Sequence, residues 1–178
     1  MVSNQLDARY ARAIFESAGL PARQARVAGE LDRVEGLTRE LPALGQILYS
    51  PVVLPAVKQA MIQSLLASQA DALTVDALFL LTDKRRERRL AGIVDALKAL
   101  IRDRDNIAQV QVTSALPLSP EDVDALRDRL ARVLNKTVEL ATTVDERLLG
   151  GIVIRIGDRL IDGSCRGQLE TLRTLLTM

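Results

Sequence analysis

Apolar residues recur at the three- and four-residue spacing of an amphipathic α-helix from Asn4 to about Arg104. Glycine or proline interrupts this pattern, notably at Gly19, Pro42 and Pro55. The pattern predicts six short helices with short connections, which is typical of a compact bundle. The predicted apolar positions are, helix by helix, Leu6, Tyr10, Ala13 and Ile14; Val27, Leu31, Val34, Thr38 and Leu41; Leu44, Ile47 and Leu48; Val57, Met61 and Leu65; most of 74–82; and Leu90, Ile93, Val94, Leu97, Leu100 and Ile101.

The hydrophobic period changes after the charged stretch 103–106, where apolar and polar residues begin to alternate. Alternation with a period of two predicts β-strands. A serine, a proline and two acids at 119–122 predict the start of a helix between two strands. Gly157-Asp158 predicts a tight hairpin, and Ser164 predicts the cap of a final helix. The apolar positions are Ala108, Val110 and Val112; Val123, Leu126, Leu130, Val133 and Leu134; Val138, Leu140 and Val144; 152–156 and 160–161; and Leu169, Leu172, Leu175 and Leu176.

These two periods predict an α+β protein with two domains. Residues 1–105 form an N-terminal six-helix bundle, and residues 106–178 form a small C-terminal α/β domain with a mixed sheet and two helices. We place the boundary near residue 105, because the hydrophobic period changes there.

The amino-acid composition limits the classes of function that this chain can have. The chain has 178 residues, of which 48% are hydrophobic and 2% aromatic, and its formal net charge is +1. It contains no histidine and a single cysteine, Cys165, so the commonest general base and metal ligand are missing. No apolar run approaches the roughly 20 residues of a membrane span, and no signal peptide is visible. We therefore expect a soluble cytoplasmic protein that is not an enzyme and that holds no cofactor or metal.

The glycines near the C-terminus fit neither a nucleotide-binding loop nor a dinucleotide fingerprint. Hairpins and strand starts need backbone angles that side chains disfavour, so turn geometry explains these glycines better. We expect Gly151 to be partly buried at the start of a strand. The residues assigned a structural role are Gly150, Gly151, Gly157, Asp162 and Gly163.

The segment 84–89 (Lys-Arg-Arg-Glu-Arg-Arg) is the only concentrated basic run. It fits either a solvated helix junction or a surface for an anionic partner, such as an acidic protein. The acids Asp145 and Glu146 are expected in an exposed turn, and Ser119 and Ser164 are better explained as helix caps than as nucleophiles. Cys165 beside Arg166 resembles a packing position more than a reactive thiol.

The first helix carries two apolar stripes. One contains Leu6, Tyr10 and Ile14, and the other contains Ala8, Ala11, Phe15 and Ala18. A surface helix needs one apolar face, so two stripes predict either a central position in the bundle or a docked partner. If a partner covers the Tyr10 stripe, the core of the bundle uses the opposite stripe.

Several motifs, in order along nearly the whole chain, resemble the delta subunits of bacterial F-type ATP synthases, the OSCP/delta family. Residues 10–15 (Tyr-Ala-Arg-Ala-Ile-Phe), 83–86 with Leu90, and 114–119 (Ser-Ala-Leu-Pro-Leu-Ser) are similar to family elements. The most specific stretch runs from Val144 to Leu169 and includes Leu149-Gly150-Gly151-Ile152. The chain departs from the family at 87–89, which is usually more apolar, and at Cys165, where an aliphatic residue is usual.

The resemblance implies a non-catalytic stator subunit that links the catalytic head to the peripheral stalk, so that proton-driven rotation is coupled to ATP synthesis. It implies that the bundle binds N-terminal segments of alpha subunits, with one alpha-subunit helix in a groove between helices one and five. The C-terminal domain would bind the C-terminal ends of the b subunits. We expect one copy per complex, no homo-oligomer, and a peripheral position on the cytoplasmic face of the bacterial plasma membrane. The positions that match the groove are Tyr10, Ala13, Ile14, Leu80 and Leu81.

Other classes stay open on the residues alone. A helical adaptor could bind another acidic or amphipathic partner. A nucleic-acid adaptor using the basic run would bind in a strongly salt-dependent way, although the balanced charge gives no support for nucleic acid. A small-molecule enzyme would need a pocket with convergent polar groups. A mitochondrial homologue is disfavoured only by the missing transit peptide.

Overall fold

The computed structural model describes residues 5–66, 69–165 and 167. The chain divides into two compact units, Met1–Ile101 and Arg102–Met178, here called the helical unit and the sheet unit. The division lies a few residues before the place near residue 105 where the hydrophobic period changes. Each unit has its own hydrophobic core.

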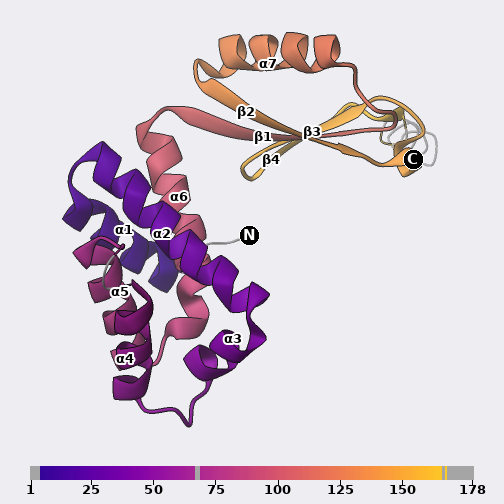
Figure 1. The fold of residues 1–178 in the computed structure, drawn as a ribbon. Helices are drawn as coiled ribbons and strands as arrows, with labels where there is room; N and C mark the ends of the chain where they lie inside the picture. The colour runs from indigo at the N-terminus through magenta and orange to yellow at the C-terminus, as the bar shows by residue number, and fades with distance from the viewer. Residues whose placement is uncertain (1–4, 67–68, 166, 168–178) are drawn as a thin grey trace. The chain divides into compact units, whose positions relative to one another are not determined.

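The described part of the helical unit is built from six α-helices and one short 3-10 helix (Figure 1). The expected helical bundle and its connections are confirmed. Proline stands at the first turn of α2, α3 and α4, where its missing N–H has no helical partner to lose. The elements are α1 (Gln5–Ala18), α2 (Pro21–Glu40), α3 (Pro42–Tyr49), α4 (Pro55–Leu66), α5 (Ala72–Asp83), η1 (Glu87–Arg89) and α6 (Leu90–Arg104).

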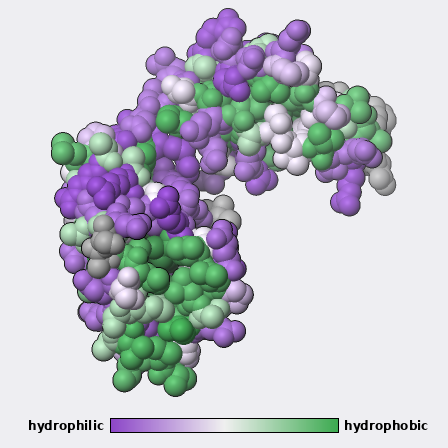
Figure 2. All heavy atoms as spheres, in the orientation of Figure 1, coloured by the Kyte–Doolittle hydropathy of each residue, from purple (hydrophilic) through white to green (hydrophobic). Residues whose placement is uncertain are grey.

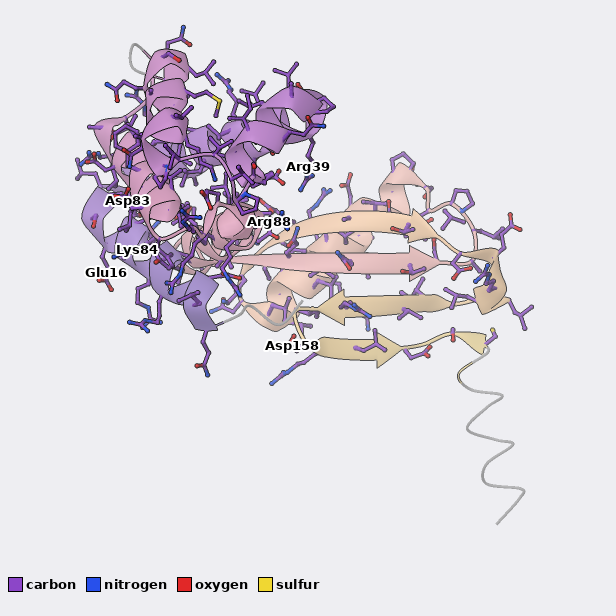
Figure 3. The ribbon with its side chains drawn as sticks, turned by 90° about the horizontal axis from the view of Figure 1, so that it is seen from below. Glu16, Arg39, Asp83, Lys84, Arg88 and Asp158 are labelled. Carbon is purple, nitrogen blue, oxygen red and sulfur yellow. The ribbon has the colours of Figure 1, made fainter. Side chains whose placement is uncertain are left out.

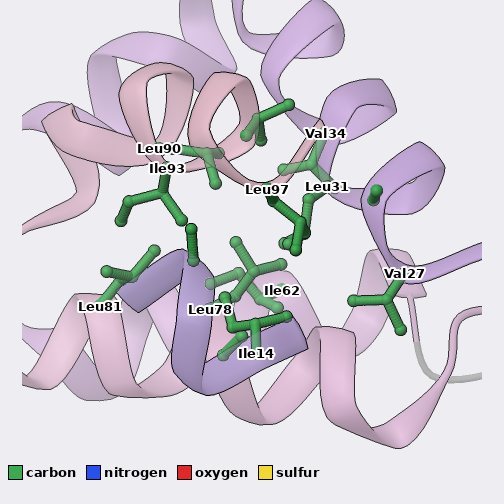
Figure 4. Close-up of a cluster of buried hydrophobic side chains, with 14 of the residues drawn as sticks. Ile14, Val27, Leu31, Val34, Ile62, Leu78, Leu81, Leu90, Ile93 and Leu97 are labelled. Atoms are coloured by element: carbon green, nitrogen blue, oxygen red, sulfur yellow. The ribbon is translucent and has the colours of Figure 1, made fainter. Parts of the chain in front are cut away.

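The core of the helical unit is formed by aliphatic side chains from all six helices (Figure 4). The largest fully buried side chains come from α2 and α6, namely Leu31, Leu90, Ile93 and Leu97. Close packing of these branched side chains holds the short helices together, since isolated helices of this length are marginal in water.

The predicted apolar stripe of α4 is wrong at two of its three positions, since only Met61 packs against the core. Val57 and Leu65 are 53% and 56% exposed, whereas Lys58 and Ile62 are buried. The helix carries two neighbouring rows of residues four apart, and its inward row begins with a lysine. Lysine is rarely buried without a partner, so a row that begins with a lysine is expected on the surface from the sequence alone. On α2, Leu41 is also misassigned, because it lies in the turn before α3 and is 54% exposed.

The sheet unit contains a four-stranded mixed sheet in the order β2-β1-β3-β4. Strand β1 pairs parallel with β2 and antiparallel with β3, and β3 pairs antiparallel with β4. The predicted mixed sheet is therefore confirmed. The elements are β1 (Ile107–Ser114), α7 (Pro120–Leu134), β2 (Thr137–Val144), η2 (Glu146–Leu148), β3 (Ile152–Ile156) and β4 (Arg159–Asp162).

Helix α7 covers one face of this sheet (Figure 1). Its Leu130 packs with Val110 and Val112 of β1, which alternate with exposed glutamines as the two-residue period requires. The predicted cap is present, since Ser119 Oγ accepts a hydrogen bond from the Asp122 N–H at 3.1 Å. The predicted final helix, with Leu169, Leu172, Leu175 and Leu176, lies outside the described residues.

The glycines of the sheet unit lie in turns and close backbone approaches. Gly151 has φ +79°, and a Cβ there would lie 2.3 Å from the carbonyl oxygen of Gly163. Its expected burial is wrong, because Gly151 is exposed and it is this backbone contact that excludes a side chain. Gly157 has φ +57° in the hairpin turn between β3 and β4 beside Asp158 (Figure 3).

The remaining residues assigned a structural role lie near Gly151, at the opposite end of β3 and β4 from the hairpin turn. A Cβ at Gly150 would meet Cys165 Sγ at 3.0 Å, and one at Gly163 would meet the Ile152 carbonyl oxygen at 3.2 Å. Asp162 Oδ1 accepts a hydrogen bond from the Ser164 N–H at 2.8 Å. Hydrogen bonds from the Ser164 side chain and backbone lower the pKa of Asp162, so this carboxylate stays charged in its role as a turn acceptor.

Candidate partner-binding groove

A hollow lies between α1 and α5 of the helical unit and extends to Arg86, the residue before η1. Leu6, Arg9, Tyr10, Ala13, Leu80 and Arg86 line it, and we call it the α1–α5 hollow. Leu80 is 45% exposed although it is a large apolar residue, and Ala13 is exposed and small. The hollow thus offers apolar surface, and its alanine allows another backbone to approach closely.

Three of the five residues expected in a groove line this hollow, namely Tyr10, Ala13 and Leu80. The structure places the other two, Ile14 and Leu81, in the core of the helical unit, where they are 8% and 2% exposed. These two positions are therefore a correction to the expected groove.

The expectation that the core uses only the stripe opposite Tyr10 is also wrong. Asp7, Ala11, Ile14 and Ala18 are the buried residues of α1, and Ala8 is exposed. Buried positions spaced by four, three and four follow the helical period, and they include one residue from the stripe assigned to the partner. The inward face of α1 thus lies between the two stripes. Leu6, Tyr10 and Ala13 remain to line the hollow, together with Arg9.

Two arginines from the basic run, one before η1 and one in it, join this segment to α1. Arg86 Nη1 donates a hydrogen bond to the Tyr10 hydroxyl oxygen at 2.8 Å, and the guanidinium carbon lies 5.7 Å from the centre of the Tyr10 ring. Arg89 Nη1 donates to Asp7 Oδ1 at 3.0 Å, which supplies a cation to a buried carboxylate. The wall of the hollow is therefore held by contacts between residues far apart in the sequence.

The rest of the basic run also binds the chain itself. Lys58 Nζ lies 2.6 Å from Glu87 Oε1, with side chains only 4% and 8% exposed. Arg85 and Arg88 donate to the backbone carbonyls of Pro51 and Tyr49. The run is therefore in large part an internal clamp on the loop between α3 and α4. Its exposed cations are Arg85 and the two residues labelled in Figure 3, Lys84 and Arg88.

A polar cluster fixes the start of α5 against α2. Asp71 caps α5 by accepting from the Leu73 N–H, and Arg23 binds its carboxylate at 2.7 Å. The hydrogen bond from Arg23, followed by the one from the Leu73 N–H, lowers the pKa of Asp71 to about 2. Glu30 Oε2 accepts from the Asp71 N–H and from Thr74 Oγ1. Burial acts to raise the pKa of Glu30, but the bonds from Thr74 and the other donors together lower it.

A second apolar hollow lies between α2, α3 and α4. Large hydrophobic residues gather on the end of the helical unit that carries α3 and α4 (Figure 2). They include Val52 and Leu54 of the connecting loop, which are well exposed. The lining residues of this second hollow are Val34, Leu37, Leu44, Leu48, Met61, Ile62, Leu65 and Leu66.

The groove residues expected from the sequence omit three that line the α1–α5 hollow, namely Leu6, Arg9 and Arg86, although Leu6 was placed on the Tyr10 stripe. The first two could have been found, because Leu6 and Arg9 share a helix face with Tyr10 and Ala13 at spacings of three and four. Arg86 could not, because it lies beyond the end of α5 and reaches Tyr10 across 76 positions of sequence. Among the residues the structure describes, no three His, Cys, Asp or Glu form a group that could hold a metal ion. No helix in those same ranges is long and apolar enough to cross a membrane.

Comparisons with known proteins give one family. A family model described as ATP synthase delta (OSCP) subunit matches residues 6–176. The ATP synthase subunit delta of Desulforudis audaxviator is 37% identical over 173 residues, covering 97% of this chain and 95% of that protein. The proteins of the same name from Heliobacterium modesticaldum and Synechococcus sp. (strain JA-3-3Ab) are 36% and 34% identical, and the matches cover 99% and 97% of this chain and 95% and 97% of those proteins.

A solved structure shares the fold. A chain in the cryo-EM structure of the Toxoplasma gondii mitochondrial ATP synthase hexamer superposes with a TM-score of 0.75 at 20% sequence identity. The match covers 97% of this chain and 98% of that chain. Both the helical and the sheet unit are therefore found together in a protein whose sequence has diverged widely.

Proposed function

Because the chain belongs to the ATP synthase delta (OSCP) subunit family, we propose that its helical unit binds alpha-subunit N-terminal helices and its sheet unit binds the C-terminal ends of the b subunits. The chain is a non-catalytic stator subunit of ATP synthase. Its work is mechanical, since a stator must resist the torque of rotation. In this proposal the chain is a peripheral component on the cytoplasmic side of the membrane, held there through the complex.

The α1–α5 hollow is the observation that carries the proposal for the helical unit. It lies between the two helices that the family resemblance implies, and Leu6, Ala13 and Leu80 give it an apolar lining. An amphipathic helix docks in such a groove through anchors spaced three and four residues apart. Ala13 would let the partner backbone approach, and Leu80 would lose the exposure that it has in the free chain.

The energy of such a contact depends on a few side chains. Full burial of one leucine contributes about 1.5–3 kcal/mol, so covering the half-exposed Leu80 contributes about half of that. Several anchors on the partner helix must add similar amounts to offset the entropy of ordering a peptide. A micromolar complex, at about 8 kcal/mol, is therefore within reach of one helix face in this hollow.

For the sheet unit, support comes from apolar residues that its core leaves uncovered. Leu160 and Ile161 of β4 are 56% and 54% exposed, and Val133 of α7 is also exposed. Exposed aliphatic groups of this kind favour a helical partner over a small ligand. The proposed partner is the end of the peripheral stalk, the b subunits.

The test is calorimetric titration of the full chain with a synthetic peptide of the alpha-subunit N-terminus from the same organism. Leu80→Asp introduces a charge into the α1–α5 hollow and should weaken binding at least a hundredfold, with little change in the thermal unfolding midpoint. Val57→Asp is the matched control, because Val57 is similarly exposed on α4 but lies outside this hollow.

Ile14→Asp is a third variant, which tests whether Ile14 belongs to the core. Its side chain is in the core, so this variant should lose the fold itself as well as binding. Equal peptide affinity of the wild type and Leu80→Asp would refute the groove. Loss of binding in Val57→Asp as large as in Leu80→Asp would place the peptide elsewhere on the helical unit.

A further inference from the structure

The α1–α5 hollow contains two positive charges and no negative charge among its lining residues. Arg9 is exposed and makes no ion pair with any residue the structure describes. Within the same described ranges, the guanidinium of Arg86 has the neutral Tyr10 hydroxyl as its partner and no carboxylate. The hollow is therefore cationic as well as apolar.

Arg89 and Arg23 differ from these two arginines, because Arg89 is paired with Asp7 and Arg23 is paired with Asp71. Arg85 and Arg88 also lack a carboxylate partner, but they donate to backbone carbonyls and do not line the hollow. A helix that covered the hollow with apolar residues alone would remove water from Arg9 and Arg86 without giving them a counter-charge. Desolvating an unpaired charge is unfavourable, so a purely apolar partner would bind weakly.

We infer that the α1–α5 hollow selects a helix with a carboxylate beside its apolar stripe, and that Arg86 and Arg9 receive this carboxylate as specificity-determining residues. The inference rests on the proposed function and adds the charge pattern that the partner helix must carry. On such a helix the acid lies three or four residues from an apolar anchor, so that both face the hollow together.

Arg86 is the better oriented of the two arginines to bind the partner's carboxylate. Tyr10 contacts it twice, through the hydroxyl bond at 2.8 Å and through the ring face at 5.7 Å, so the guanidinium plane is already oriented. An arginine has five N–H donors in a planar fork, and the bond to Tyr10 uses one nitrogen, Nη1. The other donors can bind a carboxylate in the two-point geometry that a lysine cannot provide.

The experiment uses the full chain and the alpha-subunit N-terminal peptide, made also as variants in which each Asp or Glu is replaced singly by its amide. Arg86→Gln should weaken binding of the unmodified peptide at least tenfold, and Arg9→Gln several-fold. Lys84→Gln, which removes an exposed neighbouring charge outside the hollow, should change binding less than twofold. Circular dichroism checks that each variant is folded.

The decisive result is a double-mutant cycle. One acid-to-amide change in the peptide should weaken binding to the wild type tenfold and leave binding to Arg86→Gln nearly unchanged. Arg86→Lys should fall between the wild type and Arg86→Gln, because it keeps the charge and loses the fork. If Arg86→Gln fails to fold without its Tyr10 bond, the same cycle with the exposed Arg9 takes its place.

Three results would overturn the inference. In the first, no single acid-to-amide change weakens binding to the wild type more than twofold. In the second, Arg86→Gln and Lys84→Gln weaken binding equally. In the third, the wild type does not bind the peptide at all, and the proposed function then fails together with the inference. Binding without coupling between Arg86 and a peptide acid overturns the inference alone.

Discussion

The buried ion pair between Lys58 and Glu87 offers a sharp test of how the helical unit is held together. It joins α4 to η1 at 2.6 Å, with side chains 4% and 8% exposed. Lys58→Met keeps the length of the side chain and removes its charge, which leaves the Glu87 carboxylate buried without a cation. Removing one partner of a buried pair costs about 3–5 kcal/mol. Lys58→Met should therefore lower the free energy of unfolding by about that amount.

Replacing both partners should cost much less. In Lys58→Met with Glu87→Leu the buried charge is gone, and exchange of a buried pair for apolar groups of similar volume is often neutral or stabilising. The double variant should thus lie within about 2 kcal/mol of the wild type, with a coupling energy of several kcal/mol. Lys98→Met is the control, since the exposed Lys98–Asp32 pair has the same 2.6 Å distance but side chains 36% and 49% exposed. It should cost about 0–1 kcal/mol.

The assay is urea unfolding followed by far-ultraviolet circular dichroism, at 0.1 M and 1 M sodium chloride. Salt screens exposed pairs strongly and buried pairs weakly, so the coupling between Lys58 and Glu87 should hardly change. A loss below about 1 kcal/mol in Lys58→Met, or a coupling energy that disappears at high salt, would contradict a buried pair.

Three further outcomes are expected. Gly151→Ala should destabilise the sheet unit by more than about 2 kcal/mol, because a Cβ there adds a 2.3 Å backbone clash to a positive φ. Gly157→Ala has a positive φ but open space around the Cβ, so it should cost about 1–2 kcal/mol. Thermal unfolding of the two variants measures both losses. The stability difference between the wild type and Asp71→Asn, about 1 kcal/mol after solvent screening, should be present above pH 4 and shrink as the pH falls towards 2. The stability difference shrinks at low pH because the pKa of Asp71 is lowered in the folded chain, and protonation removes the charged form that pairs with Arg23. Urea titrations between pH 2 and pH 4 measure this difference. A fragment ending after residue 104 should unfold cooperatively with a helical spectrum, and a disordered fragment would contradict an independent helical unit.

The sequence by itself determined the architecture, because the rules that set it act over a few residues. Proline at the first turn marks where α2, α3 and α4 begin, and the change from a helical period to a period of two marks the sheet unit. The hairpin at Gly157-Asp158 and the cap at Ser119 were predictable for the same reason. Each depends on backbone angles or hydrogen bonds among near neighbours in the chain.

Only the tertiary structure decided which side of each helix faces inward. Two apolar stripes on α1 left both orientations open, and the packing that buries Ile14 leaves Tyr10 to line the α1–α5 hollow. The polar contacts were equally hidden, since Glu87 finds Lys58 across 29 positions. Partners so far apart leave no periodic trace in a sequence. Their pairing is decided when packing removes water from both, because a buried charge or hydroxyl must then find its partner within the fold.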